Sequence, residues 1–225
     1  PRTSLNKLVA AGRRVRFVRL DLPAVKEQAH AAGGKVNDVV LDLIAGGLRE
    51  LLIAREEPVL GLEVVVSVAV ALRSSEEARD LGNQVGVIAV PLALGEDDAH
   101  TRLEMIAAAT RRAKAEQHPA ALQAMMGGLA ATPLAQYFIA HQHLVSAWST
   151  NLVGPPVPVY LLGARILDVV PIVDIAGNVA IAFGAISYAG RLNLVATADA
   201  TAFPDIDVVM AGIERTWRQL SSDTR

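Results

Sequence analysis

The sequence predicts an α/β domain in which a mixed β-sheet is covered by helices. In the first half of the chain, amphipathic helical patterns alternate with short β-branched runs. In the second half, several strand patterns follow one another, so strands of both directions are expected in one sheet. Apolar residues make up 52% of the 225 residues and charged residues 20%, which supports a large buried core and excludes a disordered chain.

The chain begins with a predicted strand and a short helix. Charged and apolar residues alternate over 14–20, which predicts a strand with one solvated face. Asp21 followed by Pro23 is typical of a helix start, and Gly33-Gly34 is typical of a helix end. A short helix between these two signals is therefore predicted.

A longer helix is predicted from Val36 to about Arg55. Apolar residues recur there at i, i+3, i+4 and i+7, which is the stripe of a well-buried helix. Gly46 and Gly47 interrupt this pattern, and each glycine destabilises a helix by about 1 kcal/mol. We therefore expect another backbone to pack closely against the helix at these two glycines.

Two strands and a helix are predicted in the middle of the chain. Residues 63–72 and 84–94 are mostly β-branched, which predicts short strands buried on both faces. The polar residues 73–83 between them predict a loop. Asp97-Asp98 predicts the start of a helix that continues to about Gln117, because acidic residues are favoured at the positive end of the helix dipole.

The second half of the chain is dominated by strand patterns. A Met-rich segment broken by glycines reaches Ala131, and Thr132-Pro133 predicts a helix to about Ala147. Ala189-Gly190 suits a hairpin turn, and a closing helix is predicted from Phe203 to about Leu220. The predicted strands of this half are 149–153, 159–169, 179–187 and 192–198.

Composition excludes several classes of protein and of site. The net charge is −2, so no global field attracts nucleic acid or an anionic membrane. The absence of cysteine excludes disulfides, a thiol nucleophile and thiolate metal sites. The longest apolar stretch, 169–186, is interrupted by Asp174 and Asn178, so no transmembrane segment is predicted, and no export signal opens the chain.

The five histidines form no catalytic or metal-binding pattern. His141 and His143 point to different sides of a helix, because residues two apart do not share a helix face. His30, His100 and His118 are isolated from one another in the sequence. We expect exposed or core histidines, with no catalytic residue and no metal ligand in this chain.

A polar pair opens the long predicted helix. Asn37 belongs to the residue types favoured at the N-cap, and the carboxylate of Asp38 suits the positive end of the helix dipole. The pair therefore has a structural explanation. Alternatively, this helix end lies beside an active site, where the two side chains orient a partner residue.

A second polar group stands where a predicted strand ends. Ser149, Thr150 and Asn151 precede Gly154-Pro155, a turn made rigid by proline. The hydroxyls and the amide either satisfy the backbone of this turn or donate hydrogen bonds to a developing oxyanion.

Two arginine groups and one glycine pair give weak signals. The arginines at 13, 14, 16 and 19 and the basic group at 111–114 either meet phosphates or form solvated faces. Gly82 and Gly86 lack the lysine and the helix that a P-loop requires.

Seven segments, in order and over nearly the whole chain, resemble the C-terminal half of the bacterial wax ester synthase/diacylglycerol acyltransferase family. The most specific are the Asn-Asp pair with its following helix and the Asn-x-x-Gly-Pro turn before a Tyr-Leu strand. The segments are SLN (4–6), VNDVVLDLIAGGLRELL (36–52), VVVSVAVALRS (64–74), GNQVGVIAVPLAL (82–94), STNLVGPPVPVYLLGARILDVVP (149–171), AISYAGRLNLVATAD (185–199) and FPDIDVV (203–209).

The chain departs from the family pattern at two short motifs and lacks a third. The family usually has Pro-Val-Ser before Leu-Arg, where this chain has Val-Ala-Val-Ala at 68–71. In the family turn Asn-Val-Pro-Gly-Pro, Leu152-Val153 replace Val-Pro. The family's catalytic motif, two adjacent histidines followed by three residues, Asp and Gly, is absent. The resemblance therefore implies that residues 1–225 are the C-terminal domain, cut in the linker before Pro1.

The resemblance also implies an activity and a set of site residues. The fold would be one half of a two-domain, chloramphenicol acetyltransferase-like fold with an active-site tunnel between the halves. The whole protein would transfer a fatty acyl group from acyl-CoA to diacylglycerol or a long-chain alcohol, making triacylglycerol or wax esters. A histidine of the N-terminal half would be the general base, with no cofactor and no metal. Asn37, Asp38, Ser149 and Asn151 are the expected active-site-supporting residues.

Two alternative functions remain open from the sequence. In the first alternative, the chain is a non-catalytic half-domain that binds lipid or a partner chain. In the second, it is part of a condensation-type acyltransferase that uses carrier-bound acyl donors. Under the main interpretation the partners are the N-terminal half, acyl-CoA and the acyl acceptor, with no nucleic acid. We expect a cytoplasmic protein that is peripheral to a membrane or to lipid droplets, and an apolar interface on the isolated half.

Overall fold

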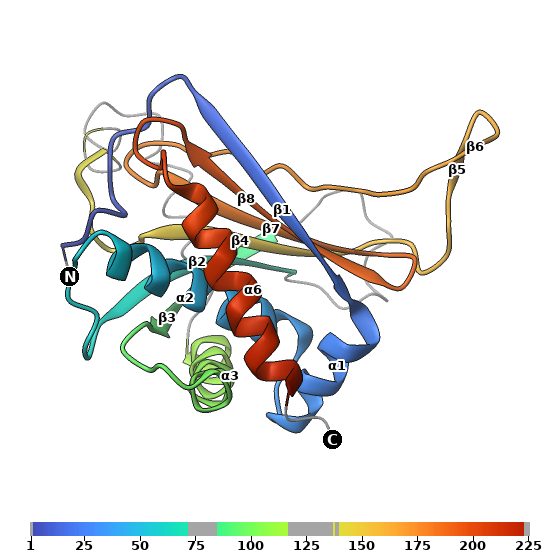
Figure 1. The fold of residues 1–225 in the computed structure, drawn as a ribbon, viewed down its shortest axis with the longest axis horizontal. Coiled ribbons are helices and arrows are strands. Elements are labelled where there is room, and N and C mark those ends of the chain that lie inside the picture. Colours follow the sequence, from blue (N-terminus) through green and yellow to red (C-terminus); the bar gives the residue numbers. More distant parts are fainter. Residues whose placement is uncertain (1, 72–84, 117–136, 138–139, 223–225) are drawn as a thin grey trace.

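A computed structural model of the chain describes residues 2–71, 85–116, 137 and 140–222. They form a six-stranded sheet with helices packed against it, and a small two-stranded hairpin projects away from the body (Figure 1). The predicted mixed α/β fold is thereby confirmed. The predicted loop over 73–83, the Met-rich segment and residues 132–136, 138 and 139 of the predicted helix over 132–147 lie outside the described residues. The predicted end of that helix near Ala147 is wrong, because helical structure ends at His141 and Ala147 already belongs to a strand.

The order of elements follows the sequence prediction closely. The described helices and strands are β1 (Arg13–Asp21), α1 (Leu22–Ala31), α2 (Val36–Ala54), β2 (Glu63–Ala71), β3 (Val85–Ala93), α3 (Ala99–Glu116), β4 (Ala147–Val153), β5 (Tyr160–Leu161), β6 (Ala164–Arg165), β7 (Ile181–Tyr188), β8 (Arg191–Asp199) and α6 (Ile206–Ser222). Asp21 caps α1 as predicted, since its carboxylate accepts a hydrogen bond from the N–H of Ala24 at 2.9 Å. None of the described helices is both long and apolar enough to span a membrane.

The large sheet has parallel strands in its centre and antiparallel strands on both sides. Its strand order is β1-β8-β7-β4-β2-β3. β2, β4 and β7 run parallel to one another, whereas β3, β8 and β1 pair antiparallel to their neighbours. The carboxyl ends of β2, β4 and β7 therefore lie at the same end of the sheet.

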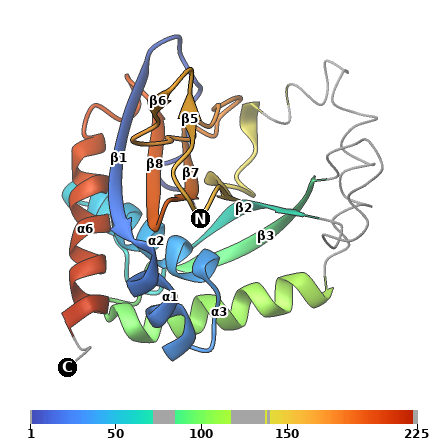
Figure 2. The same cartoon turned by 90° about the vertical axis from the view of Figure 1, so that its right-hand side faces the viewer.

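Helix α2 is the centre of the helix layer. It packs against α1, α3 and α6, and its residues from Asp38 to Leu48 are all buried. The helices lie together on one side of the sheet (Figure 2). The core forms between α2 and the strand residues that face it, such as Val66, Val68 and Phe183, which are fully buried.

The two glycines of α2 mark a close helix crossing, as predicted. A Cβ atom at Gly47 would lie 2.8 Å from the carbonyl oxygen of Val209 in α6. A Cβ at Gly212 of α6 would lie 2.8 Å from the carbonyl oxygen of Gly46. Real Cβ atoms do not approach so closely, so each helix needs glycine for the other backbone to reach it.

The prediction that β2 and β3 are buried on both faces is wrong. Along β2, Val64, Val66 and Val68 are buried, but the residues between them are only half-buried. β3 is an edge strand, and Pro91, which has no N–H to donate, is exposed on it. The helices cover only one face of these strands, and β-branched composition alone does not distinguish one buried face from two.

The predicted strand over 159–169 is also wrong. The chain reverses at Leu162 and Gly163, whose φ angles are +50° and +85°. This turn splits the apolar run into β5 and β6, which pair only with each other. The predicted hairpin turn at Ala189-Gly190 is confirmed, because both residues have positive φ and join β7 to β8.

Candidate active-site wall

The four predicted site residues belong to two elements, α2 and β4, that approach the same end of the sheet. Helix α2 begins on the side where β2, β4 and β7 end, and it runs back along the sheet (Figure 1). Asn37 and Asp38 stand at the start of α2, and Ser149 and Asn151 stand in the last five residues of β4. Ligands of open α/β sheets bind outside the carboxyl ends of parallel strands, so this end is the candidate site.

At the start of α2, Asp38 holds the helix end and Asn37 does not. The Oδ2 atom of Asp38 accepts a hydrogen bond from the N–H of Lys35 at 2.7 Å, and the side chain is only 4% exposed. Its other oxygen, Oδ1, is buried without a partner in the described part of the chain. The N-cap residue is Lys35, so the expectation that Asn37 is the N-cap is wrong. The glycines before Lys35 turn the chain earlier, and Asn37 lies inside the first turn.

In β4, Ser149 and Asn151 face the helix layer. Ser149 is in register with Val68 and Phe183, which are core residues, and Asn151 is in register with Ala185. Ser149 is 3% exposed, and its hydroxyl makes no hydrogen bond to any described residue. Both residues belong to the strand itself, so the interpretation that they satisfy the following turn is not supported.

The turn after β4 is fixed by Gly154 rather than by these polar side chains. The N–H of Gly154 donates to the hydroxyl of Ser187 at 3.2 Å. A Cβ at this position would lie 2.3 Å from the carbonyl oxygen of Ser187, so only glycine fits against β7. The carbonyl of Pro155 accepts a hydrogen bond from the N–H of Ala189 at 3.0 Å, which closes the turn.

The structure brings the polar residues together in two pairs. Ser149 and Asn151 share one face of β4, and Asn37 and Asp38 share one helix end. Within the described residues no hydrogen bond joins the two pairs. A serine hydroxyl and an asparagine amide can donate hydrogen bonds to an oxygen that gains negative charge, whereas neither group transfers protons at neutral pH.

The described histidines lie apart from this site. His30 is exposed near the end of α1, and His143 is exposed in the loop before β4. The ring of His141 stacks on Tyr137 with 4.2 Å between the ring centroids. His100 lies in α3, and His118 is outside the described residues. Among the residues described, no group of three or more His, Asp or Glu side chains is placed to hold a metal ion.

A buried ion pair beside the site was not predicted. The Nε atom of Arg102 in α3 donates to the Oδ1 atom of Asp42 in α2 at 2.6 Å, and both side chains are almost fully buried. Arg102 also donates to the hydroxyl of Thr216 in α6 and to the carbonyl of Glu96. Burial raises the pKa of Asp42 to about 6, although Arg102 acts in the opposite direction. The sequence feature that could have indicated this pair is Asp42, an acidic residue within the apolar stripe of α2.

A projecting arm is the second feature missed from the sequence. Its tip is the β5–β6 hairpin, which stands well away from the body (Figures 1 and 2). Leu162 at the tip is 100% exposed. The other exposed apolar residues of the arm and its base are Val153, Val157, Val159, Tyr160, Leu161, Leu167 and Ile172.

The base of this arm is firmly attached to the sheet. The hydroxyl of the buried Tyr188 accepts from the N–H of Val159 at 2.9 Å and donates to the carbonyl of Ile166 at 2.8 Å. The amide of Asn193 donates to the carbonyl of Val169 at 2.7 Å. Both strands of the arm are therefore held at their base, while the apolar tip is exposed.

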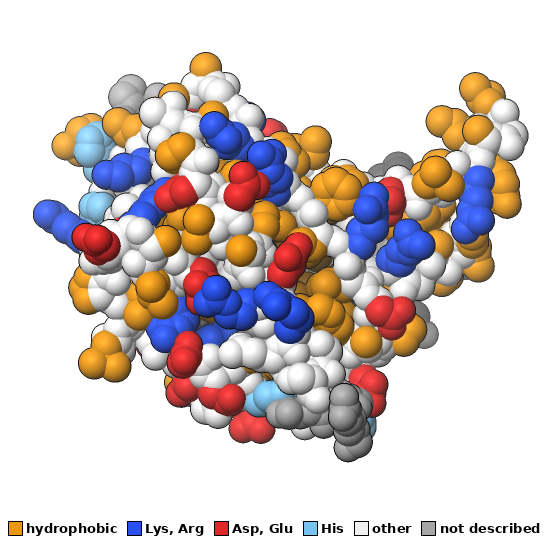
Figure 3. Space-filling view, viewed as in Figure 1, with side chains coloured by type: hydrophobic (Ala, Val, Ile, Leu, Met, Phe, Trp, Pro, Cys, Tyr) orange, Lys and Arg blue, Asp and Glu red, His pale blue; other side chains and the backbone are white. Residues whose placement is uncertain are grey.

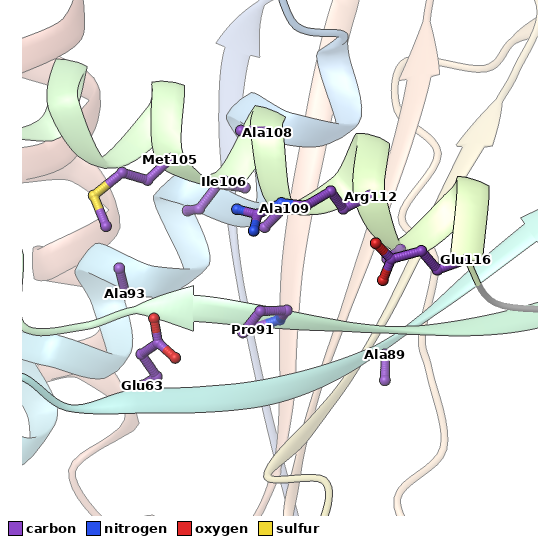
Figure 4. Close-up of a pocket in the computed structure, with 11 residues that line it drawn as sticks. Glu63, Ala89, Pro91, Ala93, Met105, Ile106, Ala108, Ala109, Arg112 and Glu116 are labelled. Carbon is purple, nitrogen blue, oxygen red and sulfur yellow. The ribbon is translucent and has the colours of Figure 1, made fainter.

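A cavity of about 450 Å³ lies elsewhere, between the edge strand β3 and helix α3 (Figure 4). Small side chains such as Ala93 and Ala109 leave this space, and Arg112 points into it between Glu63 and Glu116. None of the four predicted site residues lines it. It is therefore separate from the candidate active-site wall.

Comparison with known proteins relates this chain to lipid-modifying acyltransferases. The family model of the WS/DGAT C-terminal domain matches residues 81–221. A probable diacylglycerol O-acyltransferase of Mycobacterium tuberculosis, tgs2, is 28% identical over 98% of this chain and 50% of its own length. Another putative diacylglycerol O-acyltransferase of that organism, Rv3480c, is 30% identical over 86% of this chain and 40% of its own length.

Solved structures agree with this relationship at the level of fold. The wax ester synthase/diacylglycerol acyltransferase of Marinobacter aquaeolei VT8 superposes with a TM-score of 0.75 at 22% identity, over 98% of this chain and 51% of that one. A nonribosomal peptide synthetase, FmoA3, superposes with a TM-score of 0.64 at 16% identity, over 97% of this chain and 23% of that one. The chain spans about half the length of the curated relatives it matches. Since the family model covers residues 81–221, this chain belongs to the wax ester synthase/diacylglycerol acyltransferase family and corresponds to its C-terminal domain.

Proposed function

We propose that this chain is the C-terminal half of an acyl-CoA-dependent O-acyltransferase that makes triacylglycerol or wax esters. The acyl acceptor is diacylglycerol or a long-chain alcohol, taken from the surface of a membrane or a lipid droplet. The observation that carries this proposal is the match to the C-terminal domain of the family in a chain without adjacent histidines. The general base then belongs to the N-terminal half, and this chain forms one wall of the tunnel.

The proposed reaction is a direct acyl transfer. A histidine of the other half takes the proton of the acceptor hydroxyl while its oxygen attacks the thioester carbonyl carbon of acyl-CoA. The resulting tetrahedral oxyanion collapses, the carbon–sulfur bond breaks, and the CoA thiolate leaves and takes up a proton from the imidazolium. The products are the ester and free CoA, and neither a metal nor a covalent enzyme intermediate takes part.

The polar residues of this chain have supporting roles in the proposal. The hydroxyl of Ser149 and the amide of Asn151 lie on one face of β4, near the end where the tunnel would run. Their N–H and O–H groups provide hydrogen bonds to the oxyanion or to neighbouring groups. Asp38 fixes the start of α2 through Lys35, and so holds Asn37 and the helix end in place. All four are positioning residues, because proton transfer belongs to the histidine.

The projecting arm supports the presence of a second half. Exposed apolar side chains cover the arm from Val157 to Leu167, although its base is held by Tyr188 and Asn193. Contiguous exposed apolar surface of this kind usually marks an interface. Because the relatives are about twice as long as this chain, the N-terminal half is the partner that we assign to the arm.

The proposal is tested by reassembly of the two halves. This chain and a separately produced N-terminal half are mixed with acyl-CoA and diacylglycerol, and free CoA thiol is measured with a thiol reagent. This chain contributes no thiol background, since it has no cysteine. We expect no turnover by this chain alone and turnover by the mixture. Turnover by this chain alone that is abolished by replacing one of its five histidines would contradict the proposal.

The same assay separates the alternative functions. Turnover with an acyl group on a carrier protein, and none with acyl-CoA, would indicate a condensation-type enzyme. Lipid binding by this chain without turnover in any mixture would indicate a non-catalytic half-domain. The likeness to peptide synthetases is under 20% identical and concerns the fold alone, so the acyl-CoA reaction stays the leading proposal.

A further inference from the structure

The outer strand β1 presents an unpaired edge at the side of the molecule opposite to β3. β1 is the first strand of the sheet order, and within the described residues it pairs only with β8. The N–H of Ala200 donates to the carbonyl of Gly12, and the N–H of Leu22 donates to the carbonyl of Gly190. Bonded residues alternate along an antiparallel pair, so even-numbered residues of β1 bond to β8. The N–H and C=O groups of Phe17 and Arg19 therefore point outward.

A groove of about 440 Å³ runs along this edge. Its floor is formed by the consecutive residues Phe17, Val18, Arg19 and Leu20 of β1, and its wall by Glu214, Trp217 and Arg218 of α6. Because consecutive strand residues line it, the groove follows the edge of the strand rather than one face of the sheet. An edge strand flanked by a helix is a geometry in which an extended peptide adds as a further strand.

The charged residues that line the groove are Arg19, Arg218 and Glu214, so cations outnumber anions in its lining. In the space-filling view, Lys and Arg side chains lie over β1 and α6 together with acidic and apolar ones (Figure 3). Arg19 lies 2.7 Å from Asp168, and about half of its side chain remains exposed. Arg218 is exposed and has no carboxylate partner among the described residues; its Nε atom donates a hydrogen bond to the backbone carbonyl of Glu214 at 3.4 Å. Glu214 is the single acidic side chain of the lining.

We infer that this groove binds an extended acidic segment of a protein partner, which adds to β1 as a seventh strand of the sheet. The outward backbone groups of Phe17 and Arg19 supply its main-chain hydrogen bonds. Trp217 and Phe17 offer apolar contact to alternate side chains, and Arg19 and Arg218 select acidic ones. A second copy of this chain is a poorer occupant, because it would bring its own arginines of β1 into the same groove. The inference does not depend on the proposed acyl transfer.

Trp217 itself can report on the occupant. The chain has two tryptophans, and the substitution Trp148→Phe in β4 leaves Trp217 as the only one. The probes are capped seven-residue peptides of alternating Glu and Val, the same peptide with Lys in place of Glu, and the Glu peptide with a central proline. We expect a saturable change in Trp217 emission with the first peptide and at least a tenfold weaker effect with the other two.

Two variants locate the binding surface. Arg218→Glu should weaken binding of the Glu peptide at least tenfold, whereas Arg112→Glu, the same change of charge at an exposed residue of α3, should leave it unchanged. Equal binding of the Glu, Lys and proline-containing peptides would overturn the inference, as would no saturable signal at millimolar peptide. Self-association of the chain through β1 would also overturn the inference. That outcome is recognised when Arg218→Glu abolishes the self-association and none of the peptides inhibits it.

Discussion

The helix junction and the projecting arm distribute polar and apolar groups in opposite ways. At the junction of α2, α3 and α6, a carboxylate and a guanidinium are buried, with Arg102 bonded to Asp42. On the arm, leucines and a tyrosine are exposed to solvent, and Leu162 has no cover at all. The junction pairs its two charges within this chain, so we assign it to the stability of this half. The arm leaves its apolar surface exposed, as an interface with the proposed N-terminal half requires.

The largest expected effect on stability is at the junction. Replacement of one partner of a buried ion pair leaves the other charge buried and unpaired. Arg102→Gln leaves the Asp42 carboxylate buried without its partner, and should therefore lower the free energy of unfolding by about 3–5 kcal/mol, measured by denaturant unfolding. Arg16→Gln is the matched control, because the pair of Arg16 with Asp207 is exposed, and it should lower stability by about 0–1 kcal/mol. Similar losses in the two variants would remove the distinction between the junction and the surface.

A smaller change in the free energy of unfolding is expected at the helix crossing, where the direction of the change is informative. Helix propensity alone predicts that Gly47→Ala stabilises α2 by about 1 kcal/mol. A Cβ there would lie 2.8 Å from the carbonyl of Val209, so the two helices must move apart. We expect a loss of about 1–3 kcal/mol in the free energy of unfolding. A gain in stability would show that the α2–α6 contact is loose and that the junction is less tightly packed than its buried ion pair indicates.

The pH dependence of the junction follows from the raised pKa of Asp42. Its pKa is about 6 in the folded protein and 3.8 as the ordinary value, so the folded state binds more protons between these pH values. The contribution of Asp42 to stability therefore increases as the pH falls from about 7 toward 4. As the pH falls over this range, the free energy of unfolding of the wild type should increase relative to that of Asp42→Asn, by at most about 1.4 kcal/mol per pH unit.

The comparison with Asp42→Asn removes other titrating groups from this measurement. Asp205, whose pKa is lowered by its hydrogen bond from Arg55, titrates equally in both proteins. His100 and Asp98 also lie within electrostatic reach of Asp42 and remain in both. A gap between the two proteins that stays constant from pH 7 to pH 4 would show that Asp42 is ionised throughout.

On the arm, stability and assembly should separate. The double substitution Leu161→Ser and Leu162→Ser removes exposed apolar groups, so the free energy of unfolding should change by less than about 0.5 kcal/mol. Recovery of acyl transfer on mixing with the N-terminal half should require at least tenfold more of this chain. Leu60→Ser is the control, since Leu60 is equally exposed but lies in the loop before β2. Equal reassembly by both variants would show that the arm has no part in the interface.

The same two regions show what a sequence can predict here. Periodicity located α2 and α6, and two glycines inside a helix pattern located their crossing, because each feature is local and has one physical cause. The arm was predicted as a strand over 159–169, since its apolar residues resemble those of a buried strand. The arm differs from a buried strand only in the turn at Leu162-Gly163 and in the absence of a neighbouring strand among the described residues. The sequence pattern does not show this difference, because strand pairing depends on residues far away in the sequence.

The membership of the candidate site stays a prediction, and the structure gives only the placement of its residues. Asn37-Asp38 was selected as the start of a helix and the polar residues before Gly154 as the end of a strand, both within segments that resemble the family. Their orientations depend on strand register, which places Ser149 against the core beside Phe183. Lys35 as the N-cap could not be expected from propensity, because a lysine there has no favoured capping role and the position depends on the preceding glycines.

A further small effect is expected at the start of α2, where it shows whether Asn37 and Asp38 have a structural or a functional role. Asn37→Ala should change the free energy of unfolding by less than about 0.5 kcal/mol, because Lys35 rather than Asn37 is the N-cap. Asp38→Asn keeps an oxygen for the N–H of Lys35 but loses the charge at the helix end, so a loss of about 0.3–1 kcal/mol is expected.

In the reassembled enzyme, the same two variants distinguish positioning from proton transfer. Both should lower the rate of acyl transfer while its pH profile stays in place, because the proposed reaction assigns the titrating histidine to the other half. A shift of the acidic limb of the profile in Asp38→Asn would make Asp38 a proton-transfer residue. Unchanged rates in both variants would leave the pair with the single task of starting α2, and the candidate wall would then depend on Ser149 and Asn151 alone.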